Sequence, residues 1–382
     1  MLITSKERML IAMKNGQPDM VPVAPDISDM IPCKLTGKPF WDIYLYQDPP
    51  PWKAYIDAVK YFGFDGWLPN APNVFEKAGC SEHKRETVII FRSDERIITR
   101  EYTAKGKTGK EWSPLVTVYY RHDPPTTLAA SKLDMEGPPE KYEPIEGIKE
   151  QKKDLELLRE VKEYMGDKGV VGVSVGIPCL RNPEMPGCYS VYDYYDRYDD
   201  VKRHMEEMEE KIIMRLEKIM SAPIRPDFIL TGTSGLLVFN TPDMFRDLGL
   251  SAMRRITRIC RAAGIPSQVH CCGPERALAK MCAEETDLNS INPLEIPPMG
   301  DCNLKDLKGK FGGQLSLMGN LHTTEVMLRG SAETVRAAAH QAIDDAAEGG
   351  GFILSTGDQC GRDTPEENIF TMIETARNYG KY

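Results

Sequence analysis

Residues 352–357 read FILSTG, a short apolar run that ends in small polar side chains and glycine. Other stretches share this character, and most are apolar on successive residues rather than on alternate ones. Such runs are typical of parallel strands that are buried on both faces. The predicted strands are residues 21–27, 66–71, 170–175, 228–233, 267–272, 290–295, 316–321 and 352–357.

Helical stretches separate these runs, and this alternation predicts a (β/α)8 TIM barrel, an α/β fold that spans residues 1–382 as a single domain. Thr241 before Pro242 and Thr364 before Pro365 are helix-start signals, and Glu367 would complete a capping box with Thr364. Residues 193–220 are charged with an apolar stripe, which predicts one solvated outer helix. Several strands turn polar at their carboxyl ends, where barrels of this kind carry their active sites.

One region does not follow the barrel repeat. Residues 86–120 alternate apolar and polar side chains around turn-forming residues, which predicts an inserted antiparallel β-hairpin near the barrel mouth. Residues 122–150 are rich in proline and glutamate and are expected to form a surface connection.

Composition excludes several classes of function. A net charge of −9 argues against a nucleic-acid partner, which calls for a basic face. No stretch approaches the roughly 20 apolar residues of a membrane helix, and the first residues predict an amphipathic helix opened by Thr4 or Ser5 rather than a signal peptide. The ten cysteines lack the paired spacing of secreted proteins. We therefore expect a cytoplasmic protein with mostly free thiols.

Three residues at the carboxyl ends of two predicted strands have the chemistry of metal ligands. His270 and Cys272 are two residues apart and would share a face, while Cys271 would point away. Cys360 follows the last predicted strand. One imidazole and two thiolates suit zinc and leave a fourth position for substrate, which is the catalytic pattern. The residues alone leave open the alternative that His270 and Cys272 only pack in the core.

Five motifs stand out in the second half of the chain: TPDMFRDLGL at 241–250, HCCG at 270–273, NPLEIPPMGD at 292–301, LMGNL at 317–321 and GGGFILSTGDQCGRDTP at 349–365. These motifs resemble those of the uroporphyrinogen decarboxylase superfamily, and especially its corrinoid-dependent methyltransferase branch. The resemblance covers roughly residues 4–380.

This resemblance implies a (β/α)8 barrel in which His270, Cys272 and Cys360 bind catalytic zinc. The decarboxylase itself, a lyase, needs no metal and holds the carboxylates of a tetrapyrrole with arginines near its N-terminus. The corresponding segment here, residues 23–28, reads VAPDIS and contains no arginine. The methyltransferase branch therefore fits better than the decarboxylase.

Zinc has two roles in methyl transfer to or from a corrinoid, as a Lewis acid on the oxygen of a methyl ether or as the binder of an attacking thiol. We favour the first, with a methoxylated, and in particular aromatic, methyl donor. The alternative is transfer from a methylated corrinoid to a thiol of the coenzyme M type. A metal-free lyase or a non-catalytic barrel is a third hypothesis.

Further rim residues are candidates for the reaction. Glu295 is expected to be a displaceable fourth ligand or to position a ring hydroxyl, with a plain salt bridge as the alternative. His322 is a candidate acid or hydrogen-bond donor, or simply a satisfied histidine. Asp358 and Gln359 flank Cys360 and are expected to orient it.

The corrinoid is expected on a separate partner protein. The chain lacks the D-x-H-x-x-G motif that, by resemblance, marks a domain carrying its own cobalamin. The partner would dock over the barrel mouth so that cobalt reaches the methyl carbon. The sequence is also compatible with a homodimer.

Overall fold

The computed structural model describes residues 3–71, 85–105, 109–149, 152–183 and 188–382. The chain divides into two compact units. Unit 1 takes in the described parts of residues 1–27, 59–75 and 153–382, and unit 2 takes in those of residues 28–58 and 76–152. Helix α4, Pro51–Phe62, continues from one unit into the other.

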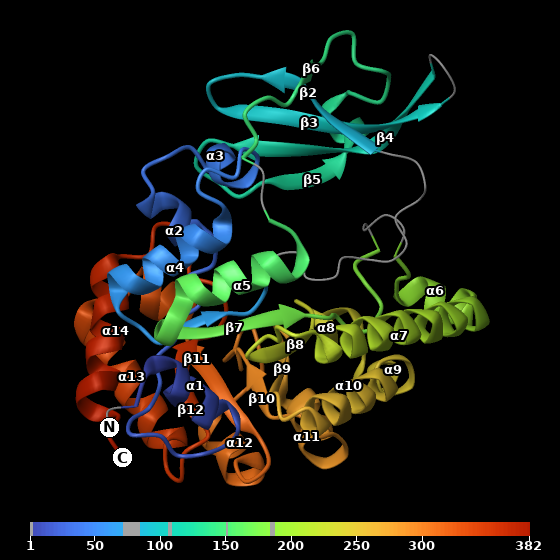
Figure 1. The fold of residues 1–382 in the computed structure, drawn as a ribbon. Helices are drawn as coiled ribbons and strands as arrows, with labels where there is room; N and C mark the ends of the chain where they lie inside the picture. Colours follow the sequence, from blue (N-terminus) through green and yellow to red (C-terminus); the bar gives the residue numbers. More distant parts are fainter. Residues whose placement is uncertain (1–2, 72–84, 106–108, 150–151, 184–187) are drawn as a thin grey trace. The chain divides into compact units, whose positions relative to one another are not determined.

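Unit 1 is built on a curled sheet of seven parallel strands, each of which overlaps a predicted run (Figure 1). The order in the sheet is β1-β7-β8-β9-β10-β11-β12, which is also the order along the chain. This is the strand order of a (β/α) barrel, as the sequence predicts. The strands are β1 Gly66–Leu68, β7 Gly169–Ser174, β8 Phe228–Gly232, β9 Ser267–His270, β10 Ser290–Asn292, β11 Ser316–Leu321 and β12 Phe352–Thr356.

The remaining predicted strand, residues 21–27, lies between β12 and β1 without forming a regular strand. Val23 makes a parallel bridge with Leu354 of β12. The backbone N–H of Ala24 donates to the carbonyl oxygen of Leu354 at 2.9 Å, and the N–H of Asp65, just before β1, donates to that of Val23 at 2.8 Å. Two prolines in the segment lack the N–H groups that a continuous ladder needs. The segment therefore takes the eighth position of the barrel through isolated bonds.

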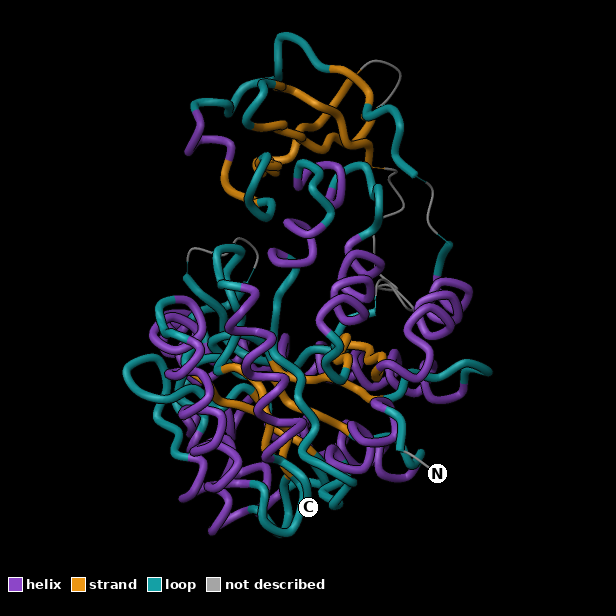
Figure 2. The backbone as a smooth tube through the Cα atoms, turned by 90° about the vertical axis from the view of Figure 1, so that its left-hand side faces the viewer, coloured by secondary structure: helices purple, strands orange, loops and turns teal. Residues whose placement is uncertain are grey.

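Helices surround this sheet, as the purple and orange segments of Figure 2 show. Within the described residues, no helix combines the length and hydrophobicity of a membrane-spanning segment. The helical elements of unit 1 are α1 Ser5–Met13, α5 Asp154–Met165, η2 Gly166–Lys168, α6 Val191–Asp196, α7 Tyr198–Ser221, α8 Leu236–Phe239, α9 Pro242–Leu248, α10 Leu250–Ala262, α11 Arg276–Glu285, α12 Leu304–Phe311, η3 Thr323–Leu328, α13 Ala332–Ala346 and α14 Glu366–Tyr379.

The predicted helix starts are confirmed in two cases and wrong in one. Thr4 forms a capping box at the start of α1, and the hydroxyl of Thr241 caps α9. The capping box predicted for α14 is not formed, because that helix begins one residue later, with Pro365 as its N-cap. The hydroxyl oxygen of Thr364 is buried and has no hydrogen-bond partner among the described residues.

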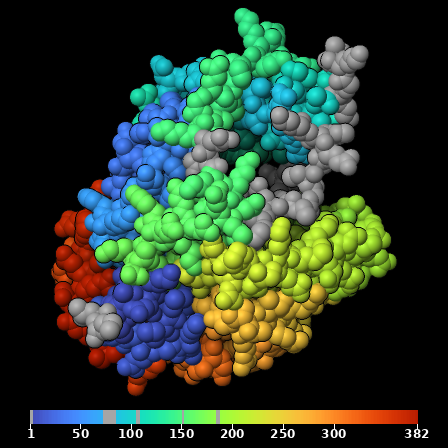
Figure 3. Space-filling model, in the orientation of Figure 1, coloured from blue at the N-terminus to red at the C-terminus, as the bar shows by residue number. Residues whose placement is uncertain are grey.

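The predicted outer helix at 193–220 is two helices, α6 and α7. Arg197 separates them with a φ of −142° and a ψ of 47°, which lie outside the helical region. Asp199 and Asp200 lie in the first turn of α7, where negative charge stabilises the amino end of a helix. Figure 3 shows α7, in yellow-green, at the surface, as predicted.

The core of the barrel is packed by large side chains from α1 and from several strands. The rings of Trp67 and Phe228 stack with centroids 6.5 Å apart. A Cβ on Gly172 would lie 2.5 Å from the Phe228 ring, so this strand position needs glycine. The buried members of the cluster are Met9, Ala12, Met13, Ala24, Trp67, Val170, Phe228, Met318 and Ile353.

Unit 2 contains a five-stranded antiparallel sheet of order β5-β4-β3-β2-β6. The prediction of a hairpin at 86–120 identified the antiparallel region, but the observed sheet is larger. The segment predicted as a surface connection contributes two of its strands and the turn η1, Ala130–Leu133. The strands are β2 Arg85–Arg92, β3 Arg96–Lys105, β4 Gly109–Tyr120, β5 Thr126–Ala129 and β6 Glu143–Pro144; the unit also holds α2 Met30–Leu35 and α3 Phe40–Tyr44.

The buried guanidinium of Arg100 fixes the connection in place. Its Nε donates to the carbonyl oxygen of Ser113, and its Nη1 donates to those of Met135 and Gly137, at 2.7 to 2.8 Å. Ile98, Val116, Val118 and Ala130 form the buried core beside it. Unit 2 therefore has an apolar core of its own.

Candidate metal centre

The candidate ligands lie where parallel strands end. His270 is the last residue of β9, and Cys272 follows two residues later. Asp358 lies two residues beyond the end of β12. Asn292, the last residue of β10, is in register with His270. These carboxyl ends form one rim of the barrel, because all the strands are parallel.

Three side chains converge at this rim. The Nε2 atom of His270 lies 3.1 Å from the Sγ atom of Cys272. One potential ligand atom from each of His270, Cys272 and Asp358 lies within 4.8 Å of the other two. Among the residues that the structure describes, this is the one group of three or more histidine, cysteine, aspartate or glutamate side chains with that geometry.

A carboxamide orients the imidazole. The Nδ1 atom of His270 faces the Nδ2 atom of Asn292 at 3.2 Å, which leaves Nε2 on the side of Cys272. The Oδ1 atom of Asn292 is buried and has no hydrogen-bond partner within the described part of the chain. A half-turn of the amide would exchange its two ends, so that Oδ1 accepts a proton held on Nδ1. That arrangement is the usual support of a metal-bound imidazole.

The protonation states of His270 and Cys272 favour the binding of a cation over the action of Cys272 as a free nucleophile. Burial lowers the pKa of His270, against the opposing effects of Asp358 and Asn292, and so favours the neutral imidazole that binds metals. Burial, followed by the charge of Asp358, raises the pKa of Cys272. A thiol held protonated is a poor nucleophile by itself, so a positive charge is needed to form the thiolate.

Asp358 has an unusual backbone and an unsatisfied oxygen. Its φ is 88°, in the left-handed region that residues with side chains rarely adopt. One hydrogen bond joins its carboxyl group to Cys272. Its Oδ1 atom is buried without a hydrogen-bond partner among the described residues. The imidazole, thiol and carboxyl groups form a donor set that fits zinc.

Cys360 lies outside this group of ligand atoms. Its side chain is fully buried and hydrogen-bonds with Thr356. Its backbone N–H donates to the carbonyl oxygen of Asp26 at 2.8 Å. Burial, together with the charge of Asp26, raises the pKa of the Cys360 thiol to about 12.

Glu295 lies near the cluster on the loop after β10. Its carboxylate accepts a hydrogen bond from the backbone N–H of Gly273, and its charge raises the pKa of Cys272. Burial raises the pKa of Glu295 itself, helped by the charge of Asp358 and opposed by the Gly273 bond. The side chain is 6% exposed, which does not fit the alternative of an ordinary surface salt bridge.

His322 has a structural task at the start of η3. Its Nδ1 atom accepts hydrogen bonds from the backbone N–H groups of Thr324 and Glu325, at 3.1 and 3.2 Å. In the neutral imidazole the proton is therefore on Nε2, which can donate a hydrogen bond. The structure thus supports the interpretation of a satisfied histidine and leaves one donor available.

Two nearby groups were not predicted from the sequence. Ser234, after β8, hydrogen-bonds the thiol of Cys272. Asn292 supports His270, and its place within the predicted strand 290–295 was a signal that could have identified it. Trp67 belongs to the barrel core, and its Nε1 donates a hydrogen bond to Gln268.

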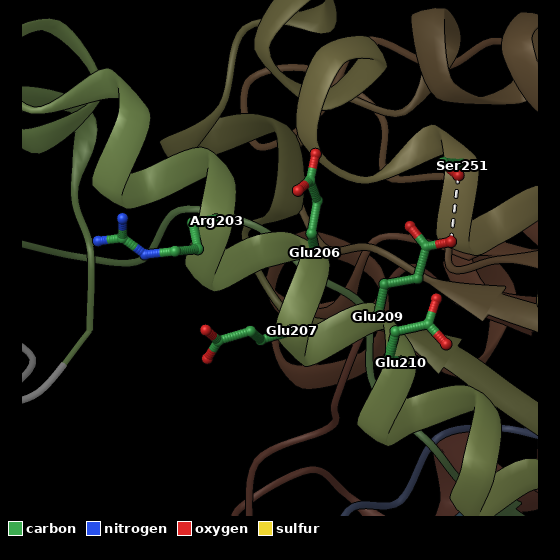
Figure 4. A pocket seen from close by; sticks show the side chains of 6 residues that line it. All are labelled: Arg203, Glu206, Glu207, Glu209, Glu210 and Ser251. Carbon is green, nitrogen blue, oxygen red and sulfur yellow. Dashed lines mark hydrogen bonds between the residues drawn. The ribbon is translucent and has the colours of Figure 1, made fainter.

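A hollow of about 460 Å³ lies elsewhere, on the surface of α7 and α10 (Figure 4). Most of its lining side chains are glutamates, and one of them, Glu209, accepts a hydrogen bond from Ser251. The hollow is lined by Arg203, Glu206, Glu207, Glu209, Glu210 and Ser251. None of the cluster residues at the rim takes part in it.

The parallel barrel and its rim cluster define an α/β-barrel protein with a candidate metal centre. Residues 193–379 match the family described as "Uroporphyrinogen decarboxylase (URO-D)", and they include His270, Cys272 and Asp358. This match, which covers just under half of the chain, agrees with the superfamily resemblance that its motifs predict. No curated protein sequence matches it significantly.

Solved structures extend the comparison. A "methyltransferase from Methanosarcina mazei" is 16% identical, with a TM-score of 0.64 over 99% of both chains, which shows that the two share a fold. A B12-independent methionine synthase from Shewanella, 12% identical, covers 67% of this chain and 70% of its own, with a TM-score of 0.37. An endoglucanase from an uncultured bacterium, 8% identical, covers 60% and 77%, with a TM-score of 0.33. The last two scores are too low to support an argument.

Proposed function

We propose that this protein is a zinc-dependent methyltransferase. It would transfer a methyl group from a methoxylated, and in particular aromatic, compound to the Co(I) corrinoid of a separate corrinoid protein. The observation that carries this proposal is the pairing of His270 and Cys272 at 3.1 Å on the catalytic rim, beside a third ligand. The methyltransferase with which the chain shares its fold over 99% of its length supports the same reaction class.

The reaction breaks a carbon–oxygen bond. The cobalt of the corrinoid supplies the electron pair for the new cobalt–carbon bond, and the ether oxygen leaves with the old bonding pair and takes up a proton. Zinc, when bound, supplies a Lewis acid that stabilises the negative charge on this oxygen. An aromatic ring disperses the same charge, so an aryl methyl ether is the easier donor.

The residues of the rim prepare the reaction. The neutral imidazole of His270 and the sulfur of Cys272 would hold the metal, and Asn292 orients the imidazole. Glu295, which is buried, bonded to the N–H of Gly273 and close enough to affect Cys272, would serve as a displaceable ligand or hold a ring hydroxyl. His322 is the candidate hydrogen-bond donor through Nε2.

Transfer from a methylated corrinoid to a thiol is the second candidate. It needs the same zinc ligands, and a metal-bound thiol would take the place of the ether oxygen. One feature of the site favours the ether. The site offers few thiolate ligands, because Cys271 is fully buried and is not part of the group of ligand atoms to which His270 belongs. A metal ion with fewer sulfur ligands is a stronger Lewis acid, and it therefore stabilises the negative charge on a leaving oxygen better.

The test combines metal analysis with a methyl-transfer assay. Full-length protein should contain one zinc ion and should form methylcobalamin from cob(I)alamin and a member of a panel of methoxybenzoates. Cys272→Ser should lose zinc and the activity, whereas Cys271→Ser, the matched control at a neighbouring buried thiol, should keep both. A folded preparation without zinc, whose activity does not change when zinc is added, would refute the proposal. Methyl transfer to a thiol without transfer from any ether would establish the second candidate instead.

A further inference from the structure

We infer that Asp358, rather than Cys360, is the third protein ligand of the metal, so that the ion is held by one imidazole, one thiolate and one carboxylate. This inference rests on the proposed zinc centre and deepens it. Sequence spacing assigned Asp358 only the task of orienting Cys360. The structure assigns it a direct contact with the ion.

Geometry is the first support. A carboxylate oxygen of Asp358, the sulfur of Cys272 and a ring nitrogen of His270 all lie within 4.8 Å of one another. Ligands of one zinc ion, each about 2.0 to 2.3 Å from the metal, must lie within such a distance of each other. The sulfur of Cys360 is not part of this group.

The unsatisfied oxygen of Asp358 is an independent observation. Its Oδ1 atom is buried and lacks a hydrogen-bond partner within the described residues. A carboxylate oxygen removed from water without a partner is costly, and native proteins rarely leave one so. A cation between the carboxylate, the sulfur and the imidazole would satisfy it. The left-handed φ of 88° at Asp358 shows that the turn after β12 holds this side chain in an uncommon backbone conformation.

The surroundings of Cys360 support the same assignment. Its thiol already bonds the hydroxyl group of Thr356, and its N–H donates to the carbonyl oxygen of Asp26. The side chain is fully buried, whereas those of His270, Cys272 and Asp358 are each partly exposed at the rim. Substrate can therefore reach an ion held by His270, Cys272 and Asp358 without moving the turn that contains Cys360.

The donor set has a chemical consequence. One thiolate and one carboxylate balance the two positive charges of zinc, as two thiolates would. A carboxylate gives less electron density to the metal than a thiolate, so the ion remains a stronger Lewis acid. Such a centre is better suited to stabilising a leaving oxygen than to keeping a bound thiolate nucleophilic.

Substitution of cobalt(II) for zinc in the full-length protein counts the thiolates directly. Thiolate ligands give charge-transfer absorption in the near ultraviolet, and its intensity rises with their number. We expect the intensity of a single thiolate, abolished in Cys272→Ser. The intensity of two thiolates in the wild-type protein would overturn the inference.

Variants provide the second arm. Asp358→Asn should weaken zinc binding at least tenfold, measured by competition with a chromogenic chelator, since loss of even an outer-shell partner costs about 10 to 100-fold. Asp358→Cys should keep the zinc and double the cobalt charge-transfer intensity. Cys360→Ser should keep the wild-type affinity and spectrum. If instead Cys360→Ser loses the metal while Asp358→Asn keeps it, Cys360 is the ligand and the inference is wrong.

These readouts separate the ligand assignment from the proposed reaction. Metal titration and cobalt spectra need no methyl donor, so they report on Asp358 even if no ether is turned over. Expected spectra without methyl transfer would support the ligand set and refute the function. Methyl transfer by a protein whose metal binding depends on Cys360 would support the function and refute the ligand set. A protein that binds no zinc would refute both the ligand set and the function.

Discussion

The carboxamide of Asn292 decides which nitrogen of His270 faces Cys272. Its Nδ2 atom lies 3.2 Å from Nδ1, and its Oδ1 atom has no hydrogen-bond partner in the described part of the chain. With the amide turned, Oδ1 accepts the Nδ1 proton and the lone pair of Nε2 points to Cys272. Asn292 is thus a positioning residue for the imidazole.

Asn292→Leu should lower zinc affinity about 10 to 100-fold, because the side chain would no longer hold the Nδ1 proton. Asn292→Asp is the matched control, since its carboxylate accepts the same hydrogen bond and should preserve binding. Chelator competition gives both affinities, and near-ultraviolet circular dichroism verifies that each variant is folded. Equal zinc affinity in Asn292→Leu and the wild-type protein would show that the carboxamide has no part in orienting the imidazole.

Some candidate ligands can be predicted from spacing and others cannot. His270 and Cys272 were selected because residues two apart at a strand end point the same way, and the structure places them together. Asp358 follows β12, where a positive φ ends the regular alternation. No periodicity predicts side-chain direction in such a turn, so the sequence could not rank Asp358 against Cys360.

At the level of elements, a buried carboxylate holds the irregular segment 21–27 in the barrel wall. Asp65 is fully buried, and one of its oxygens accepts from Nη1 of Arg8 at 2.8 Å. The other accepts from the N–H of Val23 at 2.9 Å and forms an ion pair with Arg377 at 3.0 Å. This cluster replaces part of the ladder that the prolines of the segment remove.

Asp65→Ala should destabilise unit 1 by about 3 to 5 kcal/mol, because it leaves Arg8 as a buried charge without this partner and frees the N–H of Val23. The midpoint of urea unfolding, followed by far-ultraviolet circular dichroism, measures the effect. Glu325→Ala is the control: it breaks an exposed pair with Arg329, which should change stability by less than about 1 kcal/mol. A shift for Asp65→Ala no larger than that of the control would contradict this role.

The elements themselves were largely predictable, with local exceptions. Parallel strands buried on both faces produce continuous apolar runs, so each strand of the barrel overlapped a prediction. The start of α14 and the break at Arg197 were missed. Both depend on the conformation of a single side-chain hydroxyl or a single backbone residue. Alternative conformations of such a group differ little in energy, and the choice between them leaves no repeating pattern in the sequence.

At the scale of the whole molecule, the chain forms two compact units with separate buried clusters. The candidate metal centre belongs to unit 1, and the cluster around Ile98 belongs to unit 2. Because an ion that binds only the folded state stabilises the part that holds it, zinc should act on unit 1.

Zinc at about 100 times its dissociation constant should stabilise unit 1 by about 2.7 kcal/mol. Ile98→Ala should destabilise unit 2 by about 2 to 5 kcal/mol and leave zinc affinity unchanged. Differential scanning calorimetry with and without zinc measures the thermal transitions, and chelator competition measures the affinity. A zinc affinity that falls in Ile98→Ala as far as in Cys272→Ser would show that the two units do not behave separately.

The sequence by itself determined the barrel, the resemblance to the superfamily and the pair His270 and Cys272. These depend on short-range periodicity and on motifs, which the order of residues records directly. Only the tertiary structure decided that segment 21–27 completes the barrel through isolated bonds, that residues 122–150 extend the second sheet, and that Asp358 faces the pair. Each of these depends on contacts between residues distant in sequence or on one turn's dihedral angle, and neither leaves a periodic signal.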